Sequence, residues 1–178
     1  MRWILSLVLV WLGTAATATV TLPDALSKRI KRDPAAYLDE VAALIAGHGA
    51  AGAIDADGLD DVVLLARASA RARALARVLT ADLDGDGAVT AAEVAVVSAA
   101  AAAEDRGKLA VLFVRADSDG DGVISGTEAA AFAGAAGMAA YGDVKAGQLR
   151  AVMAFDRNGD GRVTLDEVRA GLTELGLA

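Results

Sequence analysis

Three stretches of the chain share one spacing of oxygen-bearing residues: DLDGDGAVTAAE at 82–93, DSDGDGVISGTE at 117–128 and DRNGDGRVTLDE at 156–167. In each stretch an acid or an amide stands at positions 1, 3 and 5, glycine at position 6 and glutamate at position 12. A β-branched aliphatic residue occupies position 8, and a hydroxyl residue occupies position 9. Each stretch alone has an ordinary interpretation as a solvated acidic turn. Their repetition at every constrained position excludes it.

This spacing suits calcium, a hard cation that takes 6–8 oxygen ligands at about 2.3–2.6 Å. Side chains at positions 1, 3, 5 and 12 are predicted to bind the ion directly, position 7 through its backbone carbonyl, and position 9 through a water molecule. We expect three calcium ions, one in each stretch. The predicted ligands are Asp82, Asp84, Asp86, Ala88, Thr90 and Glu93; Asp117, Asp119, Asp121, Val123, Ser125 and Glu128; and Asp156, Asn158, Asp160, Arg162, Thr164 and Glu167.

The hydroxyl residue at position 9 has a second predicted role. It precedes the glutamate by three residues, which is the spacing of a helix capping box. Loop closure and the start of the following helix therefore depend on the same side chains. In the third stretch Asn158 replaces a carboxylate, which lowers the expected affinity although an amide oxygen remains a good ligand.

The three motifs resemble the loops of the calmodulin-like EF-hand superfamily, and the resemblance extends over roughly residues 34–178. It implies an all-α fold of helix–loop–helix units, called hands, and the ligand roles given above. Three complete hands and one silent hand are similar to calerythrin and the sarcoplasmic calcium-binding proteins. That similarity implies a helical calcium buffer or signal modulator.

A fourth, degenerate hand is predicted before the first complete loop. One repeat period back from Asp82, the segment 47–58 reads GHGAAGAIDADG. It keeps Gly52 at position 6 and Ile54 at position 8 but has no carboxylate at positions 1, 3, 5 or 12. We interpret it as a hand that keeps its fold and has lost its metal. An alternative is a non-standard cation site made by nearby acids, namely Asp55, Asp57, Asp60 and Asp61.

Hands dock in pairs, so the sequence predicts two pairs with short β contacts at position 8. The first pair is expected at 34–104, with Ile54 opposite Val89. The second is expected at 105–178, with Ile124 opposite Val163. Gly107 is the predicted break between the pairs, and a loose stretch containing Gly134, Gly137 and Gly142 is expected between the last two hands.

The amino terminus predicts an exported protein. Residues 1–18 combine Arg2, an apolar run and a small-x-small cleavage site, which is typical of a secretory signal peptide. An uncleaved anchor is the alternative, although the strongly apolar part is shorter than the ~20 residues of a spanning helix. Residues 19–33 are expected to form a solvated tail. The bias toward alanine, glycine and arginine suggests a bacterial protein, periplasmic or secreted.

The net charge of −7 reflects mainly the acids at the predicted ligand positions, and it argues against a nucleic-acid partner. Two basic clusters stand apart, and each is interpreted as a solvated face. The first also fits a docking surface for an acidic partner or for anionic lipid, and the second fits a membrane contact, which we consider less favoured after cleavage of the leader. The clusters are Arg67, Arg71, Arg73 and Arg77, and Lys28, Arg29, Lys31 and Arg32.

An exported calcium buffer or structural calcium-binding protein is therefore the predicted function. The alternative is a sensor that exposes an apolar groove and binds a target protein. Sensors of that kind use methionine-rich surfaces, whereas beyond the leader this chain has only Met138 and Met153. No enzyme is predicted, because the chain has no cysteine and its one histidine, His48, falls in the degenerate segment.

Overall fold

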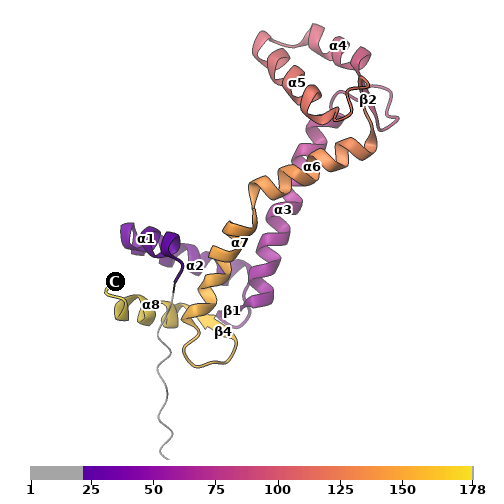
Figure 1. The fold of residues 1–178 in the computed structure, drawn as a ribbon. Helices are drawn as coiled ribbons and strands as arrows, with labels where there is room; N and C mark the ends of the chain where they lie inside the picture. The colour runs from indigo at the N-terminus through magenta and orange to yellow at the C-terminus, as the bar shows by residue number, and fades with distance from the viewer. Residues whose placement is uncertain (1–21, 178) are drawn as a thin grey trace, which may run out of the picture.

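The computed structural model describes residues 22–177, which form an elongated, mainly helical molecule with a lobe at each end (Figure 1). The predicted signal peptide lies outside the described residues. In chain order the elements are α1 (Asp24–Arg32), α2 (Pro34–His48), β1 (Ala53–Asp55), α3 (Ala56–Leu79), β2 (Val89–Thr90), α4 (Ala91–Ala100), α5 (Ala103–Ala116), β3 (Val123–Ile124), α6 (Gly126–Ala140), α7 (Asp143–Arg150), the short 3₁₀ helix η1 (Ala151–Phe155), β4 (Arg162–Thr164) and α8 (Leu165–Glu174).

Helix α3 decides how the hands are arranged. It runs for 24 residues without a break, because its sequence is rich in alanine, leucine and arginine and has no glycine or proline after Gly58. At 1.5 Å per residue a helix of this length spans about 36 Å. The degenerate loop and loop 82–93 therefore lie at opposite ends of one rod, too far apart to pair (Figure 1).

The pairing of the hands differs from the prediction for this reason. Strand β1 of the degenerate hand pairs with β4 of the last hand, with Ile54 opposite Val163. Strand β2 pairs with β3, so Val89 lies opposite Ile124. The predicted contacts of Ile54 with Val89 and of Ile124 with Val163 are wrong. The use of position 8 for each contact is confirmed.

We call the two ends the terminal lobe and the central lobe. The terminal lobe (residues 22–63 and 141–177) contains β1 and β4, and the central lobe (residues 75–132) contains β2 and β3. The terminal lobe has the larger core, in which Ile30, Val41, Phe155 and Leu172 are fully buried. The core of the central lobe is small and includes three alanines, which are Ala81, Ala116 and Ala129.

Two helices that pack through small residues connect the lobes. Helices α3 and α6 lie side by side between them (Figure 1), with Ala70 and Ala74 of one helix and Ala133 and Gly137 of the other buried. A Cβ atom added to Gly137 would lie 3.0 Å from the carbonyl oxygen of Arg67. Gly137 therefore permits close helix packing. The prediction of a loose stretch is wrong for Gly134 and Gly137, which lie inside α6, whereas Gly142 lies in the short connection to α7.

Two further expectations are corrected. Residues 24–32, predicted within a solvated tail, form α1, whose Leu26 and Ile30 are buried in the terminal lobe. The predicted break at Gly107 falls inside α5. The chain instead turns at Ala101 and Ala102, whose backbones are extended, and α5 then begins with acids in its first turn, which suits the helix dipole.

Among the described residues, no helix is both long enough and apolar enough to cross a membrane.

Candidate metal centre

Each complete loop connects two helical segments and is organised by its first aspartate. Asp82 accepts hydrogen bonds from the backbone N–H groups of Gly85, at 2.8 Å, and Gly87, at 3.1 Å. The two carboxylate oxygens thus draw the following five residues into a turn. The same pair of contacts recurs at Asp117, with Gly120 and Gly122, and at Asp156, with Gly159 and Gly161.

The backbone conformation at position 6 requires glycine, as predicted from the sequence. Gly87, Gly122 and Gly161 have φ values of 87°, 86° and 79°, in the left-handed region that other residues avoid. Position 4 has the same requirement, with φ between 73° and 76°, and the prediction overlooked it. The signal was present, since all three loops read Gly at that position, namely Gly85, Gly120 and Gly159.

The glutamate at position 12 ties the two ends of each loop together. One oxygen of Glu93 accepts from the N–H of Leu83 at 2.8 Å, and the other accepts from the N–H of Thr90 at 2.8 Å. The side chain of Thr90 in turn accepts from the N–H of Glu93, which completes a capping box. Equivalent contacts hold Glu128 to Ser118 and Ser125, and Glu167 to Arg157 and Thr164. The predicted coupling of loop and helix is confirmed.

These hydrogen bonds favour the ionised glutamates. Donation from the N–H groups of Ser125 and Ser118 lowers the pKa of Glu128 to about 2, and donation from Thr90 and Leu83 lowers the pKa of Glu93. Burial raises the pKa of Glu167. The hydrogen bonds that it accepts, of which the one from the N–H of Thr164 has the largest effect, lower the pKa by more, so the net shift is downward. All three carboxylates are therefore charged and able to accept a cation at neutral pH.

The carboxylates converge in the two loops of the central lobe. One oxygen from each of Asp82, Asp84 and Asp86 lies within 4.8 Å of the others, and the same is true of Asp117, Asp119 and Glu128. Hard oxygen donors held this close fit a hard divalent ion such as calcium.

The loop in the terminal lobe has the same backbone but fewer charges, and within residues 22–177 its Asp156, Asp160 and Glu167 do not converge as the carboxylates of the central lobe do. Asn158 takes the place of an aspartate, and its amide nitrogen donates to Asp160 at 3.0 Å while its oxygen accepts from the N–H of Asp160 at 2.8 Å. Position 5 then accepts from the N–H of position 7 at 2.8 Å, as it does in all three loops; the pairs are Asp86 with Ala88, Asp121 with Val123 and Asp160 with Arg162.

The degenerate loop has closed on itself. Ala50 and Ala53 exchange two backbone hydrogen bonds of 2.9 and 3.2 Å, and the residues between them, Ala51 and Gly52, both have positive φ, at 52° and 77°. This is the geometry of a two-residue hairpin with a type I′ turn. Backbone groups thus hold the loop closed where the complete hands have acidic side chains.

This closure leaves no room for ligands at two of the four empty positions. A Cβ atom on Gly49 would lie 2.4 Å from the carbonyl oxygen of Ala53, and one on Gly58 would lie 2.7 Å from that of His48. The alternative of a non-standard cation site nearby gains no support: within residues 22–177, the acids at 55–61 form no convergent cluster. Asp55 instead caps α3 through the N–H of Gly58.

The degenerate loop remains connected to the last complete loop. Arg162, at position 7 of that loop, donates from its guanidinium to the carbonyl oxygen of Ala50. With the strand pair of Ile54 and Val163, this contact holds the last loop against the degenerate loop. The degenerate hand is thus a scaffold for its partner.

Comparison with protein families gives one match. The family model described as EF hand matches residues 109–128 and 151–172. The first match contains the second half of α5 and the loop after it, and the second contains η1, the last loop and most of α8. Neither the curated proteins nor the solved structures gave a match. The two matches identify two of the three complete loops, with the helices next to them, as similar to EF hands.

Proposed function

We propose that this protein binds three calcium ions, one in each of the loops 82–93, 117–128 and 156–167. The EF-hand matches themselves indicate calcium binding. The observation that carries the proposal is the repeated hydrogen-bonding pattern of the three loops. In each loop the first aspartate accepts from the N–H at position 4, and the last glutamate accepts from the N–H at position 2. The acids and the amide at positions 1, 3, 5 and 12 would hold the ion, which would neutralise their mutual repulsion.

A buffering or structural role suits the terminal lobe. Its loop packs against a partner that needs no ion, and its core is already well filled, with Val163, Val168 and Leu172 fully buried. An ion bound there has little to rearrange, so it would add stability by mass action. If the predicted leader is cleaved, this role would be exercised outside the cytoplasm.

Isothermal titration calorimetry of calcium into the chelator-treated protein tests the count. Three bound ions are expected, with Asn158 giving the loop of the terminal lobe the weakest affinity. Two ions, or none, would contradict the proposal. A parallel titration with magnesium separates a calcium-selective site from a general divalent one, because magnesium needs stricter octahedral geometry.

A sensor is the second candidate, and one observation favours it. The central lobe leaves a groove between α3, α5 and α6, with the partly buried side chains of Leu112 and Phe132 on its wall. A hydrophobic-surface dye measures whether calcium changes this surface. A calcium-specific rise in dye fluorescence favours the sensor, and a flat or falling signal with calcium bound favours the buffer.

A further inference from the structure

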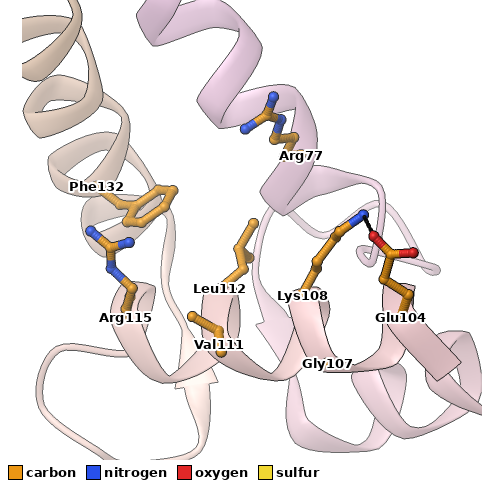
Figure 2. Close-up of a pocket in the computed structure, with 8 residues that line it drawn as sticks. All are labelled: Arg77, Glu104, Gly107, Lys108, Val111, Leu112, Arg115 and Phe132. Atoms are coloured by element: carbon orange, nitrogen blue, oxygen red, sulfur yellow. Dashed lines mark ion pairs between the residues drawn. The ribbon is translucent and has the colours of Figure 1, made fainter.

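The groove of the central lobe has a volume of about 930 Å³ and carries both apolar and charged side chains (Figure 2). It lies along α5 and is closed by Arg77, near the end of α3, and by Phe132 of α6. The lining residues are Arg77, Glu104, Gly107, Lys108, Val111, Leu112, Arg115 and Phe132.

The apolar part of the groove is left uncovered by the protein itself. Helix α4 packs only the partly buried Val94 and Val97 against the core and has no fully buried residue. The neighbouring core is built partly of alanines, so few large side chains are left to fill the space. Val111 is 58 % exposed, and Leu112 and Phe132 are only partly buried. A contiguous apolar surface of this kind is typical of an interaction site.

The charged rim is basic in a chain whose net charge is −7. Arg77 comes from α3, and Lys108 and Arg115 come from α5 (Figure 2). Lys108 pairs with Glu104 at 2.8 Å. Within the described part of the chain, neither Arg77 nor Arg115 forms an ion pair with a carboxylate.

We propose that this groove binds an amphipathic helical segment of a partner protein, with an apolar stripe flanked by acidic side chains. The stripe would cover Leu112, Val111 and Phe132, as helices fill apolar grooves elsewhere. Carboxylates beside the stripe would pair with Arg77 and Arg115, because a guanidinium binds a carboxylate through two parallel hydrogen bonds. A basic helix would instead meet two unpaired arginines and be rejected.

This proposal builds on the sensor alternative of the proposed function, since the groove belongs to the lobe that carries loops 82–93 and 117–128. Two labelled synthetic helices of identical length test it. Both have leucines at helical spacing, and they differ only in having glutamate or lysine on the flanks. Fluorescence anisotropy with the full protein, in calcium and in EGTA, gives both affinities.

The glutamate helix is expected to bind about tenfold or more tightly than the lysine helix, since an interface suppresses like-charge partners. Equal affinities, or a preference for the lysine helix, would overturn the proposal. The double variant Arg77→Glu/Arg115→Glu should reverse the preference. Arg73→Glu is the control. Arg73 is an exposed arginine of the same helix, α3, but it does not line the groove, so this variant should keep the wild-type preference.

Three other outcomes count against the proposal. If the protein binds anionic phospholipid vesicles and the glutamate helix does not displace them, the arginines belong to a membrane surface. If the protein self-associates in sedimentation and Arg77→Glu/Arg115→Glu abolishes this association, the groove binds a second copy of the chain. A calorimetric count of three calcium ions without helix binding refutes the groove proposal alone, whereas helix binding with fewer ions refutes only the calcium assignment.

Discussion

Ile54 of the degenerate hand and Val163 of the last hand are direct partners in an antiparallel strand pair. The first and last hands thereby share one lobe, and the two middle hands share the other. The rod formed by α3 requires this arrangement, because it carries the chain away from the terminal lobe before the second loop begins (Figure 1).

Engineered disulfides distinguish this pairing from that of sequential hands. The chain has no native cysteine, and Ala53 lies opposite Thr164 at a spacing that suits a disulfide. Ala53→Cys/Thr164→Cys should therefore form an intrachain disulfide, detected by mass spectrometry after oxidation in EGTA. Ala53→Cys/Thr90→Cys tests the sequential pairing and should remain reduced. A disulfide in the second variant and not in the first would refute the observed topology.

Replacing each closing glutamate should remove one calcium site. Glu93→Gln, Glu128→Gln and Glu167→Gln each lose a charge and place an amide NH₂ against a backbone N–H, which costs about 1–3 kcal/mol where a hydrogen-bond partner is lost. Calorimetry should count two strong sites in each variant. Asp166→Asn is the control, because Asp166 is an exposed acid at position 11 that pairs with Arg169 and has no predicted ligand role. Three sites of wild-type affinity in each of the three glutamate variants would contradict the ligand assignment.

The local features of the hands could be predicted from the sequence because they depend on neighbouring residues. Capping boxes, turn glycines and strand contacts at position 8 all follow from a twelve-residue motif, and even the degenerate loop keeps its frame through Ile54. The choice of partner could not be predicted in this way. It depends on whether α3 continues, and on packing that only the folded molecule shows, such as Gly137 against Arg67. A glycine that reads as a helix breaker in isolation proves to be a contact point between helices.

Restoring a ligand to the degenerate hand should fail. Gly58→Glu places a side chain where a Cβ atom would already lie 2.7 Å from the carbonyl oxygen of His48, so it should lower the free energy of unfolding by about 1–3 kcal/mol without adding a calcium site. Chemical denaturation and calorimetry measure the two effects. Ala51→Gly is the opposing control, because Ala51 has a φ of 52°, and glycine should relieve about 1 kcal/mol of strain. A fourth ion in Gly58→Glu would show that the hairpin can open.

The contact between α3 and α6 should tolerate substitution at one glycine and not at another. Gly137→Val drives a branched side chain into the carbonyl of Arg67 and should lower the free energy of unfolding by about 1–3 kcal/mol. Gly134, in the same helix, has no atom within 4 Å of an added Cβ. Gly134→Ala should therefore raise stability by about 0.5–1 kcal/mol through helix propensity alone. Urea denaturation measures both, and equal effects of the two substitutions would rule out close packing at Gly137.

The hydroxyl of Tyr37 should make the terminal lobe sensitive to alkali. It is buried and has no hydrogen-bond partner among the described residues, while its ring lies 6.2 Å from that of Phe155. Burial raises the pKa of Tyr37, and the charge of Glu40 adds to the shift. Folding thus favours the neutral phenol, and this contribution to stability is fully present below the unfolded pKa of about 10 and is lost as the pH rises above it.

Tyr37→Phe removes that dependence and keeps the ring. The variant should match or exceed wild-type stability at neutral pH, by about 1 kcal/mol, because an unpaired buried hydroxyl is costly. It should also lose less stability than the wild type when denaturation curves at about pH 9 and about pH 11 are compared. Tyr141→Phe is the control: burial also raises the pKa of Tyr141, but this residue is only half-buried, so most of the alkaline sensitivity should remain. If Tyr37→Phe loses as much stability as the wild type over this range, ionisation of Tyr37 is not the cause of the loss of stability in alkali.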